Sequence, residues 1–174
     1  NTTASNNTAV GYSALLANTT GTDNVAVGMG ALLSNTTASN NTAVGRNTLE
    51  SNTTGAGNTA LGRSALNVNN ASNNTAVGLS ALQQNTTGAS NTAFGKSAGS
   101  GNTTATNNVY IGHEAGVSGV INATGGDGIY IGAFAHGTAT DSLAPIVIGY
   151  NVAGAAGYTT LGNAGSDIRA LHGN

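Results

Sequence analysis

The sequence predicts an all-β fold, a parallel β-solenoid (β-roll) of 17-residue coils, from three observations. The first is an internal repeat anchored by a tripeptide that ends in glycine, most often Ala-Val-Gly. The second is the alternation in Asn-Thr-Ala-Val-Gly, which has the two-residue period of a strand. The third is the repeat length, since ankyrin or tetratricopeptide helix pairs need about 33 residues. A fixed period of this kind indicates stacked coils, each burying its apolar face against its neighbours.

The anchor glycines define the repeat and show where its spacing becomes irregular. Successive anchors are 17 residues apart, with one step of 16 between Gly62 and Gly78. They are Gly11, Gly28, Gly45, Gly62, Gly78, Gly95 and Gly112. Later anchors at Gly132, Gly149 and Gly162 are less evenly spaced. We therefore divide the chain into regular repeats over residues 1–112 and, over residues 113–174, degenerate repeats with longer loops and a terminal strand segment.

Each coil is expected to hold a short strand, a glycine corner, a second short strand around Ala-Leu, and an Asn-Thr-Thr loop. A leucine recurs four residues after the anchor, and we expect its side chain in the core. These leucines are Leu15, Leu32, Leu49, Leu66 and Leu82. The shortened repeat loses its residue within 67–72, and the repeat that starts at Asn108 gains its extra residues within 118–126. Length variation belongs to surface loops, because a strand that changes length slips its register.

The strand pattern also predicts self-association. Val25 and Val27 share one face, expected to be the core, and Ala26 lies on the opposite face. A small residue there would allow another chain to approach, although an alanine that merely faces solvent is the alternative. Burial of one Val or Leu contributes only about 1.5–3 kcal/mol, whereas ordering the backbone costs about 1–2 kcal/mol per residue. We therefore expect a homo-oligomer wound around a shared axis, most simply a homotrimer.

Composition excludes several function classes. Charged residues make up 6% of the chain and the net charge is −2, so no electrostatic footprint for nucleic acid is present. No apolar run is long enough for membrane insertion, and the absence of cysteine excludes disulfides and thiolate metal sites.

Catalytic chemistry finds little support in the sequence. The carboxylates and the three histidines are scattered, which predicts no catalytic, cofactor or metal site and no enzyme activity. Glu114 and Asp127 lie in successive coils and could form the carboxylate pair of a glycosidase; the alternative is a pair of solvated loop charges. Ser166–Arg169 is expected to be a terminal strand.

Each Asn-Thr-Thr loop begins with a sequon, a candidate glycan acceptor in a secreted protein. The candidates are Asn18, Asn35, Asn52, Asn85 and Asn102. The alternative is structural, because asparagine at a corner tolerates left-handed geometry and hydrogen-bonds the local backbone.

The recurring Asn-Thr-Ala-Val-Gly-x-x-Ala-Leu and the later NNVYIGHEAG (107–116) resemble the head repeats of trimeric autotransporter adhesins. The 17-residue unit with its Asn-Thr-Thr loop is similar to repeats of phage tail fibres, and TTLGNAGSDIRALHG (159–173) resembles the stretch that often precedes their self-cleaving chaperone. The resemblance implies a left-handed parallel β-roll within a trimeric fibre, located outside a cell, on a cell surface or on a virion. It also implies attachment to a cell-surface glycan or envelope receptor.

The sequence thus predicts a structural or adhesive fibre segment without a cofactor, whose partners are its own copies and a surface receptor. An extracellular filament subunit is an alternative of the same kind. An ice-binding solenoid is another, because stacked Asn-Thr-Thr loops would place threonine in ranks. These ranks are Thr19, Thr36, Thr53, Thr86 and Thr103, and Thr20, Thr37, Thr54, Thr87 and Thr104. Asn70-Ala71 interrupts both ranks.

Overall fold

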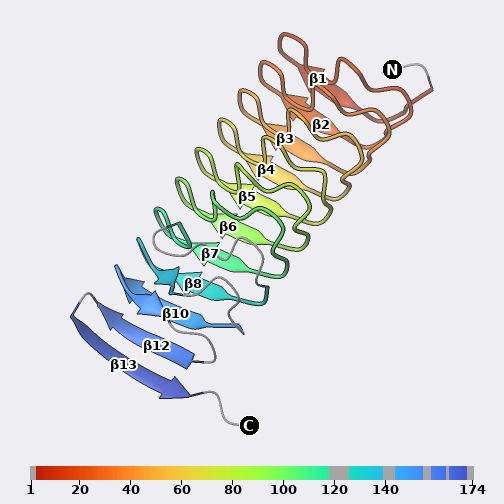
Figure 1. Cartoon of the computed structure of the whole chain (residues 1–174). Helices are drawn as coiled ribbons and strands as arrows, with labels where there is room; N and C mark the ends of the chain where they lie inside the picture. The colour runs from red at the N-terminus through yellow and green to blue at the C-terminus, as the bar shows by residue number, and fades with distance from the viewer. Residues whose placement is uncertain (1–2, 118–125, 139–143, 155–157, 164, 172–174) are drawn as a thin grey trace.

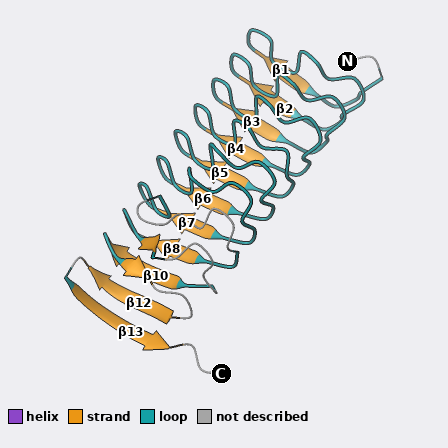
Figure 2. Cartoon of the chain, in the orientation of Figure 1, coloured by secondary structure: helices purple, strands orange, loops and turns teal. Residues whose placement is uncertain are grey.

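The computed structural model confirms an all-β parallel solenoid whose coils repeat about every 17 residues (Figure 1). It describes residues 3–117, 126–138, 144–154, 158–163 and 165–171. Within these residues the chain forms strands and loops and no helix (Figure 2). Accordingly, no helix in the described part of the chain is a candidate membrane span.

One sheet runs the length of the molecule, in the order β1-β2-β3-β4-β5-β6-β7-β8-β10-β12-β13. Its strands are β1 (Thr8–Val10), β2 (Val25–Val27), β3 (Thr42–Val44), β4 (Thr59–Leu61), β5 (Thr75–Val77), β6 (Thr92–Phe94), β7 (Val109–Ile111), β8 (Ile129–Ile131), β10 (Ile146–Tyr150), β12 (Tyr158–Asn163) and β13 (Ser166–Leu171). A second, two-stranded sheet pairs β9 (His136–Gly137) with β11 (Ala153–Gly154). The main sheet is parallel as far as β12, and β13 then returns antiparallel along it.

The strands alternate as predicted, but the assignment of their two faces was wrong. From β2 to β12 of the main sheet, one residue of each strand points inward and is fully or almost fully buried, whereas Ala9 of the end strand β1 is exposed. These residues are Ala26, Ala43, Ala60, Ala76, Ala93, Tyr110, Tyr130, Val147 and Thr160. The flanking residues, such as Val25 and Val27, are only partly buried. Alanine therefore does not mark an outer face open to a second chain, and the self-association argument built on it fails.

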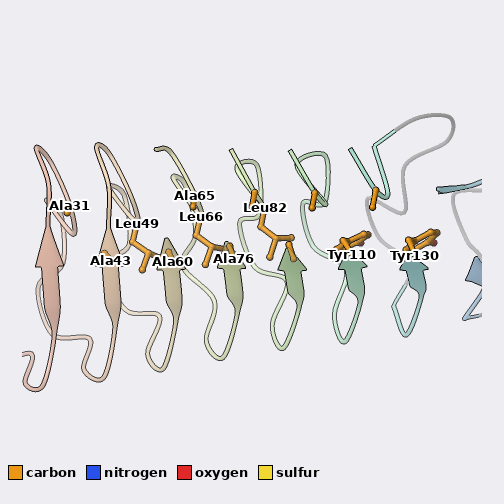
Figure 3. Packing of buried hydrophobic residues seen from close by; sticks show 14 of the residues in the cluster. Ala31, Ala43, Leu49, Ala60, Ala65, Leu66, Ala76, Leu82, Tyr110 and Tyr130 are labelled. Carbon is orange, nitrogen blue, oxygen red and sulfur yellow. The ribbon is translucent and has the colours of Figure 1, made fainter. Parts of the chain in front are cut away.

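The reversal follows from what fills the other side of the coil. Leu49 and Leu66 are fully buried in the same apolar cluster as Ala43 and Ala60 (Figure 3). A narrow coil that already holds a leucine has room for little more than a methyl group opposite it, since protein interiors are close-packed. In β2 to β6, where the inward residue is alanine, the larger Val, Leu and Phe side chains are therefore placed outside.

The Ala-Leu segment, expected to be a second strand, is a turn. Leu32 and Leu66 have φ angles of 50° and 49°, in the left-handed region that no strand uses. Their backbones still join the stack, because the Leu32 N–H donates to the Thr48 carbonyl at 3.0 Å. Leucine thus enters the core from a left-handed turn, and all five recurring leucines are buried.

The anchor glycines stack directly on one another. Gly28 has a φ of 133°, and a Cβ added to it would lie 2.5 Å from the Gly45 carbonyl oxygen. Both the backbone conformation and the lack of space exclude a side chain at this corner. The fixed glycine in each repeat is thereby explained by the contact between successive coils.

The C-terminal coils change their core. Tyr110 and Tyr130 replace the central alanine, and their rings stack with centroids 5.4 Å apart and planes 7° apart (Figure 3). After β10 the stack ends in the β12–β13 hairpin, where Leu161 pairs with Ile168. The segment Ser166–Arg169 is thus strand, as the sequence predicts. The extra residues expected within 118–126 lie, apart from Gly126, outside the described residues.

Candidate functional site: the outer face of the sheet

The outward side chains of the main sheet form two parallel rows. The first row, at the start of each strand, mixes threonine with Val and Ile, as in Thr42, Thr59 and Val109. The second row, at the end of each strand, is wholly apolar. We call it the apolar row, and it consists of Val10, Val27, Val44, Leu61, Val77, Phe94, Ile111, Ile131, Ile148 and Leu161.

The residues of the apolar row are exposed or partly exposed along its length. Phe94 is 59% exposed, Val10 57% and Leu61 48%. Strand pairing aligns each member with the next, so that Val44 lies beside Leu61 and Leu61 beside Val77. No charged residue occurs in strands β1 to β8. A continuous apolar strip of this kind at a protein surface marks an interaction site.

Aromatic residues gather at the C-terminal end of this face. The Phe134 ring lies edge-on to His113, with centroids 5.1 Å apart, and edge-on to Tyr150 at 6.1 Å. His113 Nε2 also lies 3.2 Å from Glu114 Oε1. Asp127, the other carboxylate considered for glycoside chemistry, instead accepts a hydrogen bond from Asn107 Nδ2 at 3.0 Å. The two carboxylates therefore have different partners, and no contact in the described chain joins them.

The sequon asparagines lie inside the solenoid, a location that the sequence analysis missed. Asn35, Asn52, Asn85 and Asn102 are fully buried and Asn18 is 2% exposed. Each amide nitrogen donates to a backbone carbonyl within its own loop, as Asn35 Nδ2 does to Ala38 O at 3.0 Å. Several also donate to the asparagine of the preceding coil, such as Asn35 to Asn18 at 2.9 Å. These contacts correct the glycosylation hypothesis, because the amide of a glycan acceptor must be accessible.

A second asparagine ladder lies beside the strands. The residues that open each repeat are buried: Asn24, Asn41, Asn58, Asn74, Asn91 and Asn108. Asn41 is typical, since its Oδ1 accepts from the Asn58 N–H at 2.9 Å and its Nδ2 donates to Gly55 O at 2.9 Å. The sequence signal for these buried amides is the recurrence of asparagine at two fixed places in each repeat, because a loop that only faces solvent would not require the same amide each time.

The shortened repeat keeps its place in the ladder. Asn69 Nδ2 donates to Ala71 O, two residues on, whereas Asn52 Nδ2 donates to Gly55 O, three residues on. Asn85 still reaches Asn69 Oδ1 at 2.7 Å. The missing residue is therefore taken from the exposed part of the loop, as predicted.

The threonine ranks of the ice-binding alternative do not lie on strands. In the first rank the hydroxyls bond the next coil, as when Thr19 Oγ1 donates to Thr36 O at 2.9 Å. In the second rank, residues such as Thr37 and Thr54 are exposed, but they lie in loops. An ice face requires flat strands, so these loops do not supply the expected plane.

No group of three or more His, Asp or Glu side chains among the described residues is placed to hold a metal ion, and no pocket is present in that part of the surface. Comparisons of the chain with protein-family models, with curated proteins and with solved structures found no match. The apolar row is thus the most distinctive functional feature of the described surface.

Proposed function

We propose that this chain is a segment of a structural and adhesive fibre, in which copies pack through their apolar rows around a shared axis. The observation that carries the proposal is the exposed apolar row along the sheet. Burial of apolar surface contributes about 25 cal/mol per Å², so this strip favours association once a matching surface is present. The proposed interface is the face of the strands that carries the apolar row, whereas the face expected from the sequence carries Ala26.

Copies of the same chain fit this row better than an unrelated partner. The row repeats with every coil and varies in size from Val27 to Phe94, so a matching partner needs the same coil-by-coil spacing. A second copy supplies that spacing. Around a closed symmetry axis each copy also covers the strip of another copy, which leaves no apolar strip free.

The resemblance to adhesin heads and tail-fibre repeats supplies the number of copies, which is three. It also supplies the location, which is a fibre outside a cell, on a cell surface or on a virion. A fibre of this kind presents its loops in many repeated copies, which suits weak multivalent attachment to a surface glycan or envelope receptor. No catalytic step is part of this proposal.

The experiment is a measurement of solution mass by light scattering on the chain and on two variants. We expect the parent to have three times the 16.8 kDa mass of one chain. Leu61→Lys places a charge in the centre of the apolar row and is expected to give folded monomers. Leu16→Lys is the matched control, because Leu16 is 68% exposed but lies off the sheet. A parent that is a folded monomer would overturn the proposal, and a thermal-hysteresis assay would then test the ice-binding alternative.

A further inference from the structure

Three of the chain's four Lys and Arg residues occupy the same position in the coil, directly after an anchor glycine. These are Arg46, Arg63 and Lys96. We call this position the corner column. It consists of Tyr12, Met29, Arg46, Arg63, Leu79, Lys96, His113, Ala133 and Tyr150.

Backbone hydrogen bonds align the column along the solenoid. The Arg46 carbonyl accepts from Ser64 N–H at 2.9 Å, and the Arg63 carbonyl accepts from Ser80 N–H at 2.9 Å. Lys96 continues the same ladder two coils further, where its carbonyl accepts from Glu114 N–H at 2.9 Å. Neighbouring coils are about 4.8 Å apart, so Arg46 and Arg63 are adjacent in the column and Lys96 follows one coil after Leu79, which places the three cations along one line beside the sheet.

The fold does not require these charges. The column also accommodates Met29, Leu79 and Ala133, so its backbone geometry tolerates uncharged side chains. Arg46 lies directly beside Arg63, and like charges opposed on adjacent strands are destabilising. All three cations are exposed, and no ion pair joins any of them to a carboxylate in the described part of the chain. Their collection in one column therefore points to an external anion.

The surroundings of the column suit a sugar chain. On one side lies the next position of each coil, which carries hydroxyl and amide groups at Asn47, Ser64 and Ser97, all half-buried. The apolar row lies on the other side, across the glycine corner, and in the proposed fibre it is covered by another copy, so the hydroxyl and amide side remains beside the column. Hydroxyls and amides exchange hydrogen bonds with sugar hydroxyls.

We propose that the corner column binds a linear anionic polysaccharide laid along the solenoid axis, with carboxylate or sulfate groups on the cations. This inference rests on the proposed attachment function and names the class of its receptor. A second copy of the chain fits the column less well, because the carboxylates of the described parallel coils form no matching line: Asp23 and Asp127 share one coil position, and Glu50 and Glu114 stand at two others. Single-stranded nucleic acid is disfavoured too, since the column from Arg46 to Lys96 holds no aromatic ring on which bases could stack.

The test measures binding of the full chain to immobilised heparin, hyaluronan and neutral dextran, with a single-stranded oligonucleotide as a second polyanion. We expect binding to the two acidic polysaccharides and none to dextran. The triple variant R46Q/R63Q/K96Q should weaken that binding by about tenfold or more. The matched control is T37E/S51E/T87E at three exposed loop positions, which reaches the same net charge of −5 (−2 − 3) and is expected to retain most of the binding.

The column proposal is overturned if the triple variant binds like the parent, if the control loses as much affinity, or if the parent binds neither acidic polysaccharide. Equal or tighter binding to the oligonucleotide would overturn the polysaccharide assignment. Light scattering on the same samples separates the two proposals. An assembled parent without polysaccharide binding defeats the column alone, whereas a monomeric parent that binds defeats the fibre and leaves the column standing.

Discussion

Tyr110 occupies the space that a leucine fills in the coils as far as Leu82, and Gly116, together with Gly99 of the preceding coil, makes room for it. A Cβ on Gly116 would collide with Cδ1 and Cε1 of the Tyr110 ring. Gly116 stands four residues after its anchor, where Leu66 stands in an earlier coil that carries Ala60 on its strand. In this coil, tyrosine replaces the alanine of the strand and glycine replaces the leucine of the turn. The large side chain of the core therefore comes from the strand and no longer from the turn.

This exchange predicts that Tyr110 and Gly116 are energetically coupled. Tyr110→Ala should cost about 3–5 kcal/mol through the cavity it leaves. Gly116→Leu alone should destabilise as well, because its side chain meets the tyrosine ring. The double variant restores the Ala and Leu arrangement, so its loss should be smaller than the sum of the two single losses. Denaturant unfolding measures the cycle.

The control for this cycle pairs Gly116→Leu with Tyr12→Ala, since Tyr12 is 79% exposed at the other end of the stack. Additive losses are expected for that pair. Equal coupling in both cycles would show that Tyr110 and Gly116 do not share space in solution.

The asparagine ladder predicts a strong effect from a polar residue that looks like part of a loop. Asn41→Ala removes the acceptor of the buried Asn58 N–H, whereas Gly55 O loses one of two donors and keeps the hydrogen bond from Asn52 Nδ2. An unpaired buried group costs about 1–3 kcal/mol, so we expect a loss of about 1–3 kcal/mol. Hydrogen exchange should show the loss in adjacent coils, because a solenoid couples only neighbouring repeats.

Thr37→Ala is the matched comparison for Asn41→Ala, since Thr37 is exposed in the neighbouring loop. It should change the unfolding free energy by no more than about 0.5 kcal/mol. If Asn41→Ala were equally mild, the ladder would contribute nothing to stability.

The sequence predicts the period, the corner glycines and the leucine core, because each depends on one residue type that recurs at a fixed spacing. Gly28 is fixed by contact with the next coil, and such a constraint recurs unchanged in every unit. The short loop at Asn69 was predictable too, because the strands on either side kept their spacing.

The face of the strand could not be predicted from the apolar pattern. In Thr-Ala-Val both faces carry apolar residues, and the usual rule buries the larger one. Here the interior beside Leu49 admits only Ala43, so the larger Val44 is placed outside. The rule fails because the coil is too narrow for two large side chains. The sequence did not reveal the buried asparagines for a similar reason, since an asparagine among small and polar residues is ordinarily read as solvated.

The glycine corner predicts a sharp contrast between two positions only two residues apart. Gly28→Ala forces a side chain into a φ of 133° and against the Gly45 carbonyl, so backbone strain alone should cost about 1–3 kcal/mol. Gly30→Asn should be tolerated, because Gly30 has a φ of 68° and Asn47 occupies the same position of the next coil with a φ of 56°. Thermal melts of the two variants test this, and equal losses would contradict the stacked corner.

The buried tyrosine predicts that stability declines in alkali. Burial, followed by the proximity of Tyr130, raises the pKa of Tyr110 far above its usual value near 10. Below about pH 10 the phenol is protonated in both states, and its contribution to stability is fully present. Above that pH the unfolded chain releases a proton that the folded chain keeps, so the free energy of unfolding should fall by up to about 1.4 kcal/mol per pH unit. Tyr110→Phe cannot ionise and should have a flatter profile in denaturant melts at increasing pH. Identical slopes for parent and variant would show that Tyr110 ionises as easily in the folded chain as in the unfolded one.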